Sequence, residues 1–551
     1  MEIAALPDDA LADVLRCLPA QSLAAARCVC KAWRAVVDAR ALLLPHLLPH
    51  QVCGVFINYI DHDRPHLFAR PCSTSSLTID GMLSFMPNDH WRDWWSVQDH
   101  CNGLLLCDIE WERDLCVCNP ATRQCAVLPR RTEDTRYTGA YLAFDPAVSP
   151  HYEVFLIPNV PEKPPAPKVD EKHRALLRQQ ELEAPFCLDW LFSLPDNTLI
   201  AEDEEEELQQ VPSVDEENEP DDDPCRLMEW PPSSWTFNVF SSRTGQWENR
   251  TFFREGEPMG TIENIRLDPS EPTCRGPRRR YAMYWQGALY VHCRGAFVTR
   301  LPLSNDKYQV IKTPPNIGKA KPYLGKSEKG VTFGIVDGCK LQVWILSESS
   351  KQMGWTLKYE DDLKQYAQHV ATLPYDNGRL VDGSWNVEED IDVHDSGGDA
   401  VESLLTKNLE EENIDVHDSD DDNVESLLTH NLEEHIDVDD CDDDDVESLL
   451  TKKSEWDSDN DDLFTVDVED EVFFIENFDI LGFHPYKEVI FLVEPFAALA
   501  YHLNSSKVQY LGNSRPKSYY RNYTNGIYES FVYTPCMIGV RHGDSCVQSS
   551  S

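Results

Sequence analysis

The sequence predicts a multidomain α+β protein, in which a small N-terminal three-helix unit precedes an all-β domain whose favoured architecture is a β-propeller. Three observations lead to this prediction. Residues 1–48 space their apolar side chains as helices do, short runs with a period of two recur from about residue 52, and two acidic tracts interrupt those runs. A chain of 551 residues is also too long for one ordinary core.

The N-terminal unit shows its helix signals in order. Asp8 or Asp9 is expected to cap a first helix, which Pro19 ends. Apolar side chains of this helix follow at i, i+3, i+4 and i+7, at Leu11, Val14, Leu15 and Leu18. Ser22 is expected to cap a second stretch, and helical spacing returns at Val29, Trp33, Val36 and Val37. Because so short a unit rarely buries enough apolar surface to be stable alone, it is expected to dock on a partner, on the rest of the chain, or on both.

The β-rich region consists of many short runs bounded by Gly, Pro, Asn and Asp. The clearest runs are residues 125–129, 152–158, 235–241, 288–293, 341–346, 472–475 and 488–493. A series of this length favours a propeller. An irregular pair of sandwiches is the alternative that stays open.

Two segments interrupt the β pattern. Residues 161–233 begin Pro-rich, cross a short helix candidate near 171–183 and enter an acidic tract, where 201–223 hold 13 acidic and no basic side chains. Residues 388–471 hold 35 acidic side chains and three lysines, and repeat one short unit three times. Dense like charge predicts solvated, flexible chain. The expected organisation is therefore a helical unit at 1–48 and a β-domain at 52–160, 234–387 and 472–551, with insertions at 161–233 and 388–471.

Charge and composition exclude several classes of protein. The net charge is -47, but the two tracts account for nearly all of it, so the folded part is close to neutral and offers no basic surface for nucleic acid. No apolar run approaches the roughly 20 residues that span a membrane. The acidic N-terminus lacks the features of a signal peptide, so a cytoplasmic or nuclear protein with reduced thiols is expected. The 18 cysteines include no C-x-x-C pair, and neither a metal site nor a cofactor is expected.

The N-terminal unit resembles the F-box family. The resemblance rests on Leu6-Pro7-Asp8-Asp9, Val14-Leu15, Leu18-Pro19, Ser22-Leu23 and the run RCVCKAWR at 27–34. Ala10 and Ala12 depart from the pattern, in which bulkier residues are common. The resemblance implies that the unit binds a Skp-type adaptor and, through it, a cullin. By motif position, the adaptor-binding residues are expected to be Leu6, Pro7, Val14, Leu15, Leu18, Pro19, Leu23, Val29, Cys30, Lys31 and Trp33.

The rest of the chain looks like the plant F-box-associated, kelch-like region. The motifs are NGLLL at 102–106, CNPATRQ at 118–124, YLAFDP at 141–146 and VFSSRTGQW at 239–247. The resemblance implies a propeller that presents an unknown protein substrate, and hence a non-catalytic substrate receptor of a ubiquitin ligase. A ligase-independent interaction scaffold is the open alternative. Clustered aromatic side chains are favoured anchors at interfaces, which makes Trp91, Trp94 and Trp95 candidates for partner contacts.

Four weaker signals accompany these motifs. Residues 320–327 resemble a permissive nucleotide-binding loop, but prolines and a strand-like run at 331–336 replace the required strand and helix. An aspartate series at 457–461 mimics the first calcium ligands of an EF-hand without the later ones. The acidic repeat contains Ile-Asp-Val runs typical of SUMO-interacting strands, and serines that suit an acidophilic kinase. No motif of an enzyme active site is present, so catalysis is not expected.

Overall fold

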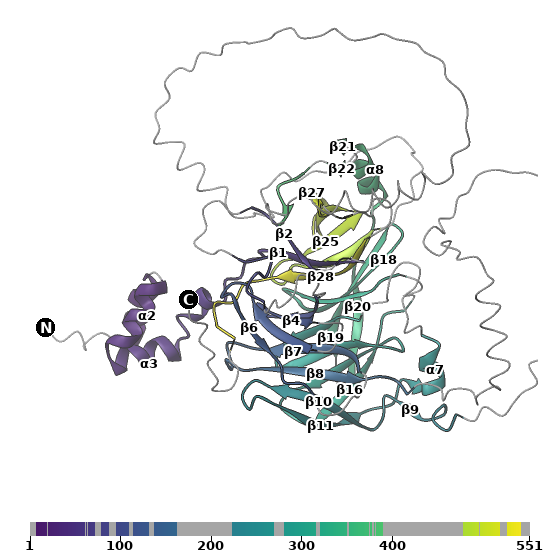
Figure 1. The fold of residues 1–551 in the computed structure, drawn as a ribbon, viewed down its shortest axis with the longest axis horizontal. Helices are drawn as coiled ribbons and strands as arrows, with labels where there is room; N and C mark the ends of the chain where they lie inside the picture. Colours follow the sequence, from purple (N-terminus) through teal and green to yellow (C-terminus); the bar gives the residue numbers. More distant parts are fainter. Residues whose placement is uncertain are drawn as a thin grey trace, which may run out of the picture.

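The computed structural model describes residues 7–18, 20–60, 62, 64–71, 79–86, 95–109, 114–131, 137–161, 223–268, 280–315, 320–349, 352–373, 375–376, 379–380, 382–388, 478–494, 496–517, 519 and 526–540. A helical unit lies beside a larger β-domain (Figure 1). Several expectations concern residues outside these ranges: Leu6, Pro19, Trp91, Trp94, the helix candidate near 171–183, the acidic repeat beyond 388 and the strand-like run at 472–475.

The helical unit consists of α1 (Asp8–Arg16), α2 (Ala20–Val29), α3 (Lys31–Ala39) and the short α4 (Leu44–Leu47). Its helices pack around a core of their own, formed by Leu11, Ala12, Leu15, Leu23, Ala26, Val36, Val37 and Leu42. The predicted helical spacing is therefore confirmed at Leu11 and Leu15, whereas Val14 is exposed. Ala12 is completely enclosed in this core, so the small residue at this position is part of the packing.

The predicted helix caps were wrong in detail. Pro7 is the N-cap of α1, and Asp8 and Asp9 lie in its first turn, where acidic side chains favour the positive end of the helix dipole. Ser22 lies inside α2 and does not cap it. The N-cap of α3 is Cys30, whose Sγ accepts the backbone N–H of Trp33 at 3.4 Å.

In the described part of the chain, the larger sheets of the β-domain are four four-stranded antiparallel sheets and one eight-stranded sheet. The eight-stranded sheet divides into two four-stranded halves, and these halves and the four smaller sheets are called the six units below. Three of them follow the chain directly: β3 (Trp95–Cys101), β4 (Leu104–Ile109), β5 (Asp114–Asn119), β6 (Gln124–Val127); β17 (Tyr323–Ser327), β18 (Gly330–Asp337), β19 (Lys340–Ser349), β20 (Gln352–Asp362); and β24 (Asp479–Phe483), β25 (Val489–Glu494), β26 (Ala497–His502), β27 (Lys507–Asn513). Alternating burial of side chains along β3 fits the period of two that the sequence predicts.

Two further units join into one eight-stranded sheet. They are β7 (Tyr137–Phe144), β8 (Tyr152–Pro158), β10 (Ser234–Ser241), β11 (Gln246–Glu255), and β13 (Ala282–Trp285), β14 (Ala288–Cys293), β15 (Phe297–Pro302), β16 (Lys307–Lys312). Their outer strands β11 and β16 pair in parallel, starting at Phe253 opposite Lys307. The end strands β7 and β13 are also in contact, so this sheet is nearly closed.

The sixth unit joins distant parts of the chain. Its order is β28 (Ile527–Tyr533), β1 (Gly54–Tyr59), β2 (His66–Ala69) and β23 (Asn386–Val387), and Phe56 lies opposite Phe531 in the register. The first strands of all six units touch in cyclic order, β3 to β7, β13, β17, β24, β28 and back to β3. These contacts form a closed circuit, in which β28, the strand that pairs with β1, links β24 back to β3.

Small elements lie between these sheets. They are β9 (Glu229–Trp230), β12 (Gly260–Thr261), α7 (Ile262–Arg266), α8 (Lys364–Thr372), β21 (Tyr375–Asp376) and β22 (Arg379–Leu380). Trp230 is buried in the β-domain core, so the segment predicted as a linker to residue 233 is already part of this domain from residue 223. α8 was not predicted, and its Tyr366 and Val370 pack with Leu341 of β19 and Ile490 of β25.

The prediction of short N-terminal helices followed by a β-rich domain is confirmed. Two predicted runs, 152–158 and 288–293, coincide with β8 and β14, and 331–336 lies within β18. No helix among the described residues combines the length and the apolar character needed to cross a membrane.

Candidate functional site: a helical docking face and a central cavity

The helical unit divides the expected adaptor-binding residues into two groups. Leu15 and Leu23 are buried in its core, and Leu18 and Trp33 pack partly against that core. The others among the described residues are exposed: Pro7, Val14, Val29, Cys30 and Lys31. The sequence could not make this division, because helical spacing does not say which apolar residues a third helix will cover.

Two valines carry the exposed apolar surface of this unit. The side chains of Val14 and Val29 are 57% and 66% exposed. Fully burying a side chain of this size is worth about 1.5–3 kcal/mol, so both positions gain from a partner that covers them. Cys30 and Lys31 follow Val29 directly and extend the exposed stretch to the start of α3.

Ion pairs on the surface of the unit link α3 and the residue after it to α2 and α1. Arg27 on α2 donates two hydrogen bonds to Asp38 on α3, at 2.6 and 3.1 Å. This bidentate contact lowers the pKa of the Asp38 carboxyl and raises that of the Arg27 guanidinium. Arg40 makes a second pair with Asp9 of α1. The unit is therefore a preformed surface, whose apolar core and polar contacts do not depend on Val14 or Val29.

The helical unit and the β-domain meet at the C-terminal segment 534–540. The backbone N–H of Met537 donates to the Leu47 carbonyl at 2.8 Å. Asn119, the last residue of β5, donates to the carbonyls of Cys536 and Ile538 at 2.9 and 2.8 Å. In Figure 1 this last segment runs from the β-domain to the base of the helices.

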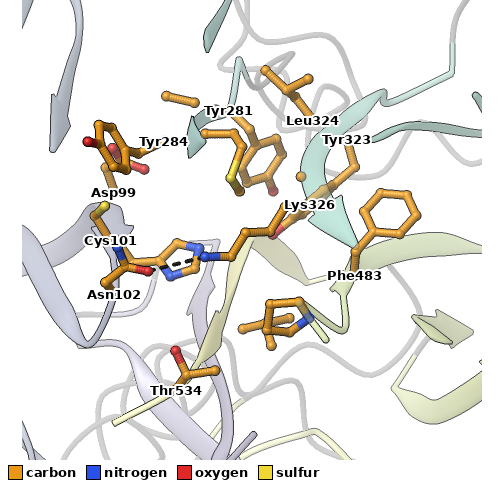
Figure 2. Close-up of a pocket in the computed structure, with 16 residues that line it drawn as sticks. Asp99, Cys101, Asn102, Tyr281, Tyr284, Tyr323, Leu324, Lys326, Phe483 and Thr534 are labelled. Carbon is orange, nitrogen blue, oxygen red and sulfur yellow. Dashed lines mark hydrogen bonds between the residues drawn. The ribbon is translucent and has the colours of Figure 1, made fainter. Parts of the chain in front are cut away.

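A cavity opens between the first strands of five of the six units. It contains about 570 Å³ of space, part of it open to solvent. Its walls come from β3, β13, β17, β24 and β28, and the residues that matter below are Asp99, His100, Asn102, Tyr281, Tyr323 and Lys326. Figure 2 shows Lys326 reaching across the cavity towards Asn102, with a distance of 3.2 Å between Lys326 Nζ and Asn102 Oδ1.

Burial sets the ionisation of the cavity side chains. It raises the pKa of Asp99 well above its usual range, although the Leu142 backbone N–H donates to Asp99 Oδ2 at 2.7 Å. Burial and the nearby charge of Lys326 lower the pKa of His100 to about 3, so its imidazole is neutral at physiological pH. Burial also lowers the pKa of the Lys326 ammonium and raises that of the Cys101 thiol to about 12.

Two stacked tyrosines line the cavity. The rings of Tyr281 and Tyr323 lie 4.0 Å apart, and the Tyr323 hydroxyl donates to the Ser530 carbonyl at 3.0 Å. The same tyrosines line a second hollow on their other side, where Lys321 pairs with Asp479 at 2.9 Å. Lys321 therefore pairs with a carboxylate, whereas the partner of Lys326 is the neutral amide oxygen of Asn102.

The rim of the cavity lies against the connection to the helical unit. Pro485 and Thr534 line the cavity. The adjacent Tyr486 hydrogen-bonds the Thr534 side chain and stacks on His50, with ring centroids 4.4 Å apart. His50 belongs to the segment that links α4 to β1. The helical unit is thus attached at the mouth of this cavity.

Sequence reasoning missed the cavity residues. Lys326 falls within the run that resembles a nucleotide-binding loop, but this run forms β17, so its backbone amides are used in strand pairing. Asn102 belongs to the NGLLL motif at 102–106, and His100 lies just before this motif. His100 and Asn102 lie together at the end of β3, and Lys326 is brought to them from β17 by long-range packing, for which a single sequence gives no local signal.

A cluster of four cysteines lies on the sheet β3–β6. Cys107 Sγ and Cys118 Sγ are 3.8 Å apart, and the Cys116 thiol hydrogen-bonds Cys125. This hydrogen bond lowers the pKa of the half-buried Cys125 thiol to about 7. In the part of the chain that the structure describes, no group of three or more His, Cys, Asp or Glu side chains is arranged to hold a metal ion.

Trp95, one of the expected partner-contact tryptophans, is buried in the core beside Phe56 and Val97. It therefore supports the packing of β3 in this structure. The other two tryptophans of the cluster are outside the described residues.

Comparison with known proteins identifies the N-terminal unit. Residues 3–44 match the F-box domain. The chain is similar to the Arabidopsis thaliana F-box protein At1g52495, at 26% identity over 28% of this chain and 38% of that protein. It is also similar to the Arabidopsis F-box protein At5g07610, at 28% identity over 27% of this chain and 37% of that protein.

These similarities cover limited parts of each protein. The alignments span less than two fifths of the length of the curated relatives. A solved structure from a study of two prolyl endopeptidases aligns with 59% of this chain and 46% of that chain, at 11% identity. Its TM-score of 0.20 is too low to support any argument about fold or activity.

Proposed function

We propose that this protein is the substrate receptor of a Skp–cullin–F-box ubiquitin ligase, a non-catalytic subunit that binds a Skp-type adaptor through its F-box. The observation that carries the proposal is the F-box match at residues 3–44 on a helical unit with its own core and two exposed valines. A partner helix or groove that covers Val14 and Val29 removes apolar surface from water without disturbing that core.

Within the helical unit, the buried residues are proposed to stabilise the fold and the exposed residues to bind the adaptor. Leu15 and Leu23 hold the helices together. Pro7, Val14, Val29, Cys30 and Lys31 contact the adaptor, with Leu6 and Pro19 as further candidates from the sequence. The cullin is reached through the adaptor.

The β-domain is proposed to be a six-bladed propeller that presents a protein substrate. The cyclic contacts of β3, β7, β13, β17, β24 and β28 support this architecture, because each of these strands starts a four-stranded unit and faces the common axis. Since the helical unit is assigned to the adaptor, the β-domain is left for the substrate, and its central cavity is the candidate site.

The test is a pull-down of Skp-type adaptor and cullin with full-length protein. Val14→Glu combined with Val29→Glu places charge on the proposed docking face and should abolish capture. Val148→Glu is the matched control, because Val148 is 82% exposed on the β-domain and the same change there should leave capture intact. If folded wild-type protein captures no adaptor, or if the double variant captures as much as wild type, the ligase proposal fails and an interaction scaffold becomes the better explanation.

A further inference from the structure

The central cavity holds a cation without a counter-ion. Within the described residues, Lys326 Nζ has one polar partner, the neutral Asn102 Oδ1, and no carboxylate lies within ion-pair distance. The nearby Asp145 carboxyl is hydrogen-bonded to the Tyr284 side chain. Placing an ammonium group in such a site is costly unless an anion compensates it.

A second polar side chain in the same cavity is also available. His100 contacts Phe531 edge-on, with ring centroids 5.7 Å apart, and its ring nitrogens have no hydrogen-bond partner among the described residues. Because the imidazole is neutral, one of its nitrogens carries a proton that it can donate. Lys326 and His100 come from β17 and β3, so the closure of the ring brings the two donors into one cavity.

The charge of the cavity favours a carboxylate over a phosphate. One lysine supplies one positive charge, which matches a singly charged carboxylate. A phosphate group carries about -1.5 to -2 charges at neutral pH, and it would lie near Asp99 and Asp145 with its second charge uncompensated. Apolar walls at Leu324, Phe483 and Val532 leave room for the aliphatic part of a ligand.

We propose that the cavity binds a carboxylate group of the polypeptide that the β-domain recognises, with Lys326 as its cationic partner and His100 as a hydrogen-bond donor. This inference rests on the proposed role of the β-domain as the substrate-binding part. The carboxylate belongs either to an acidic side chain or to a chain terminus. Both sources present the same carboxylate group to Lys326, and the experiment below distinguishes between them.

The test measures the melting temperature of the full-length protein with small probes at equal ionic strength. Sodium acetate at about 50 mM should raise Tm by about 2 °C relative to sodium chloride, while neutral acetamide should not. Lys326→Met should lose this response, and Lys326→Arg should keep it. Lys358→Met is the matched control, because Lys358 is an exposed lysine on β20 of the same four-stranded sheet, and this variant should respond as wild type does.

Two further probes distinguish the two possible sources of the carboxylate by the Tm shift that each produces. N-acetylglycine mimics a chain terminus, and N-acetylglutamic acid α-amide mimics an acidic side chain. The probe that produces the larger, Lys326-dependent shift identifies the source.

Three results would overturn the proposal. They are the absence of an acetate-specific shift in wild type, an equal shift in Lys326→Met, and a larger shift with phosphate than with acetate. If wild type shows no acetate response and Lys326→Met melts below wild type, Lys326 is a structural link to Asn102. Adaptor capture is measured on the same samples, so wild-type protein that shows no acetate response but still captures the adaptor refutes the cavity proposal and leaves the proposed ligase function standing.

Discussion

Arg266 forms an ion pair with Asp223, the residue at which the described chain resumes after the gap that follows Pro161. The same guanidinium donates to the Pro161 carbonyl from Nε at 2.9 Å and from Nη2 at 2.5 Å. One side chain on α7 therefore ties together the two points where the first acidic insertion leaves and re-enters the β-domain.

Arg266→Met is expected to lower the free energy of unfolding by about 3 kcal/mol, because it removes the cation from a carboxylate whose side chain is 2% exposed. Lys307→Met is the comparison: the pair of Lys307 with Glu255 is 58% and 42% exposed, and its loss should cost less than about 1 kcal/mol. Chemical denaturation followed by tryptophan fluorescence measures both. Equal costs for the two variants would contradict the role of Arg266.

Gly103 and Gly287 occupy equivalent turns and provide a matched pair. Asn102 and Gly103 have φ of 46° and 87°, and Gln286 and Gly287 have φ of 46° and 76°, so both turns need left-handed backbone. A Cβ on Gly103 would lie 2.4 Å from Cys536 Cβ, whereas one on Gly287 meets nothing within 4 Å. Gly103→Ala should therefore cost about 2 kcal/mol more than Gly287→Ala in unfolding experiments.

The Gly103→Ala variant should also loosen the C-terminal segment that contacts the helical unit. Faster proteolysis within 534–540 than in Gly287→Ala measures this effect. If the two variants show the same stability and the same cleavage rate, Cys536 does not pack against the turn as described.

The pH dependence of stability should contain a contribution from His100. An unfolded histidine has a pKa of about 6.5, and in the native protein burial lowers the pKa of His100 to about 3. Between these values the unfolded chain binds a proton that the native state does not, so stability falls as pH is lowered. The loss between pH 7 and pH 5 is expected to reach about 2 kcal/mol.

His100→Gln removes this contribution. The difference between the free energies of unfolding of wild type and His100→Gln should therefore shrink from pH 7 to pH 5, as measured by urea denaturation. Lys326→Met should reduce the acid loss partly, because the charge of Lys326 helps to lower the pKa of His100. A difference that stays constant with pH would show that His100 can be protonated in the folded protein.

Cys125 should react with iodoacetamide at lower pH than an ordinary thiol. Its pKa is lowered to about 7 by the hydrogen bond from Cys116, compared with about 8.5 for a free cysteine. Mass spectrometry of labelled peptides should give a rate that is half-maximal near pH 7. Cys116→Ala should shift this midpoint upwards, whereas Cys107→Ala, which removes a member of the other close pair, should not. If the midpoint of Cys125 labelling does not shift in Cys116→Ala, the hydrogen bond from Cys116 is not the cause of the lowered pKa.

Local patterns were sufficient to predict much of the β-domain. The runs 152–158 and 288–293 coincide with β8 and β14 because alternating apolar residues and bounding turn residues act within a few positions. The F-box resemblance rests on motifs within the first 34 residues for the same reason. Val14 is exposed and Leu15 is buried because of where α2 and α3 pack against α1. The helical spacing alone could not predict which of the two side chains would be covered.

The sequence patterns could not predict which distant strands pair with each other. Asn58 on β1 hydrogen-bonds Glu529 on β28 across 471 positions of the chain. The meeting of Lys326 with His100 and Asn102 depends on the same closure, since β17 and β3 are separated by β7 and β13 on one side of the circuit and by β24 and β28 on the other. A period of two predicts that a strand exists, but it carries no information about which strand lies beside it.

The pairing of β1 with β28 has a consequence for how the protein is made. At about 5–20 residues per second, tens of seconds pass on the ribosome between the synthesis of β1 and that of β28. During this time the F-box can fold around its own core, while β1 waits with an unpaired edge that is open to aggregation. Translation that stops before residue 527 would release a chain with a finished F-box and an open ring. Under the proposed function, such a truncated product would occupy the adaptor without delivering a substrate, and would therefore inhibit the full-length protein made in the same cell.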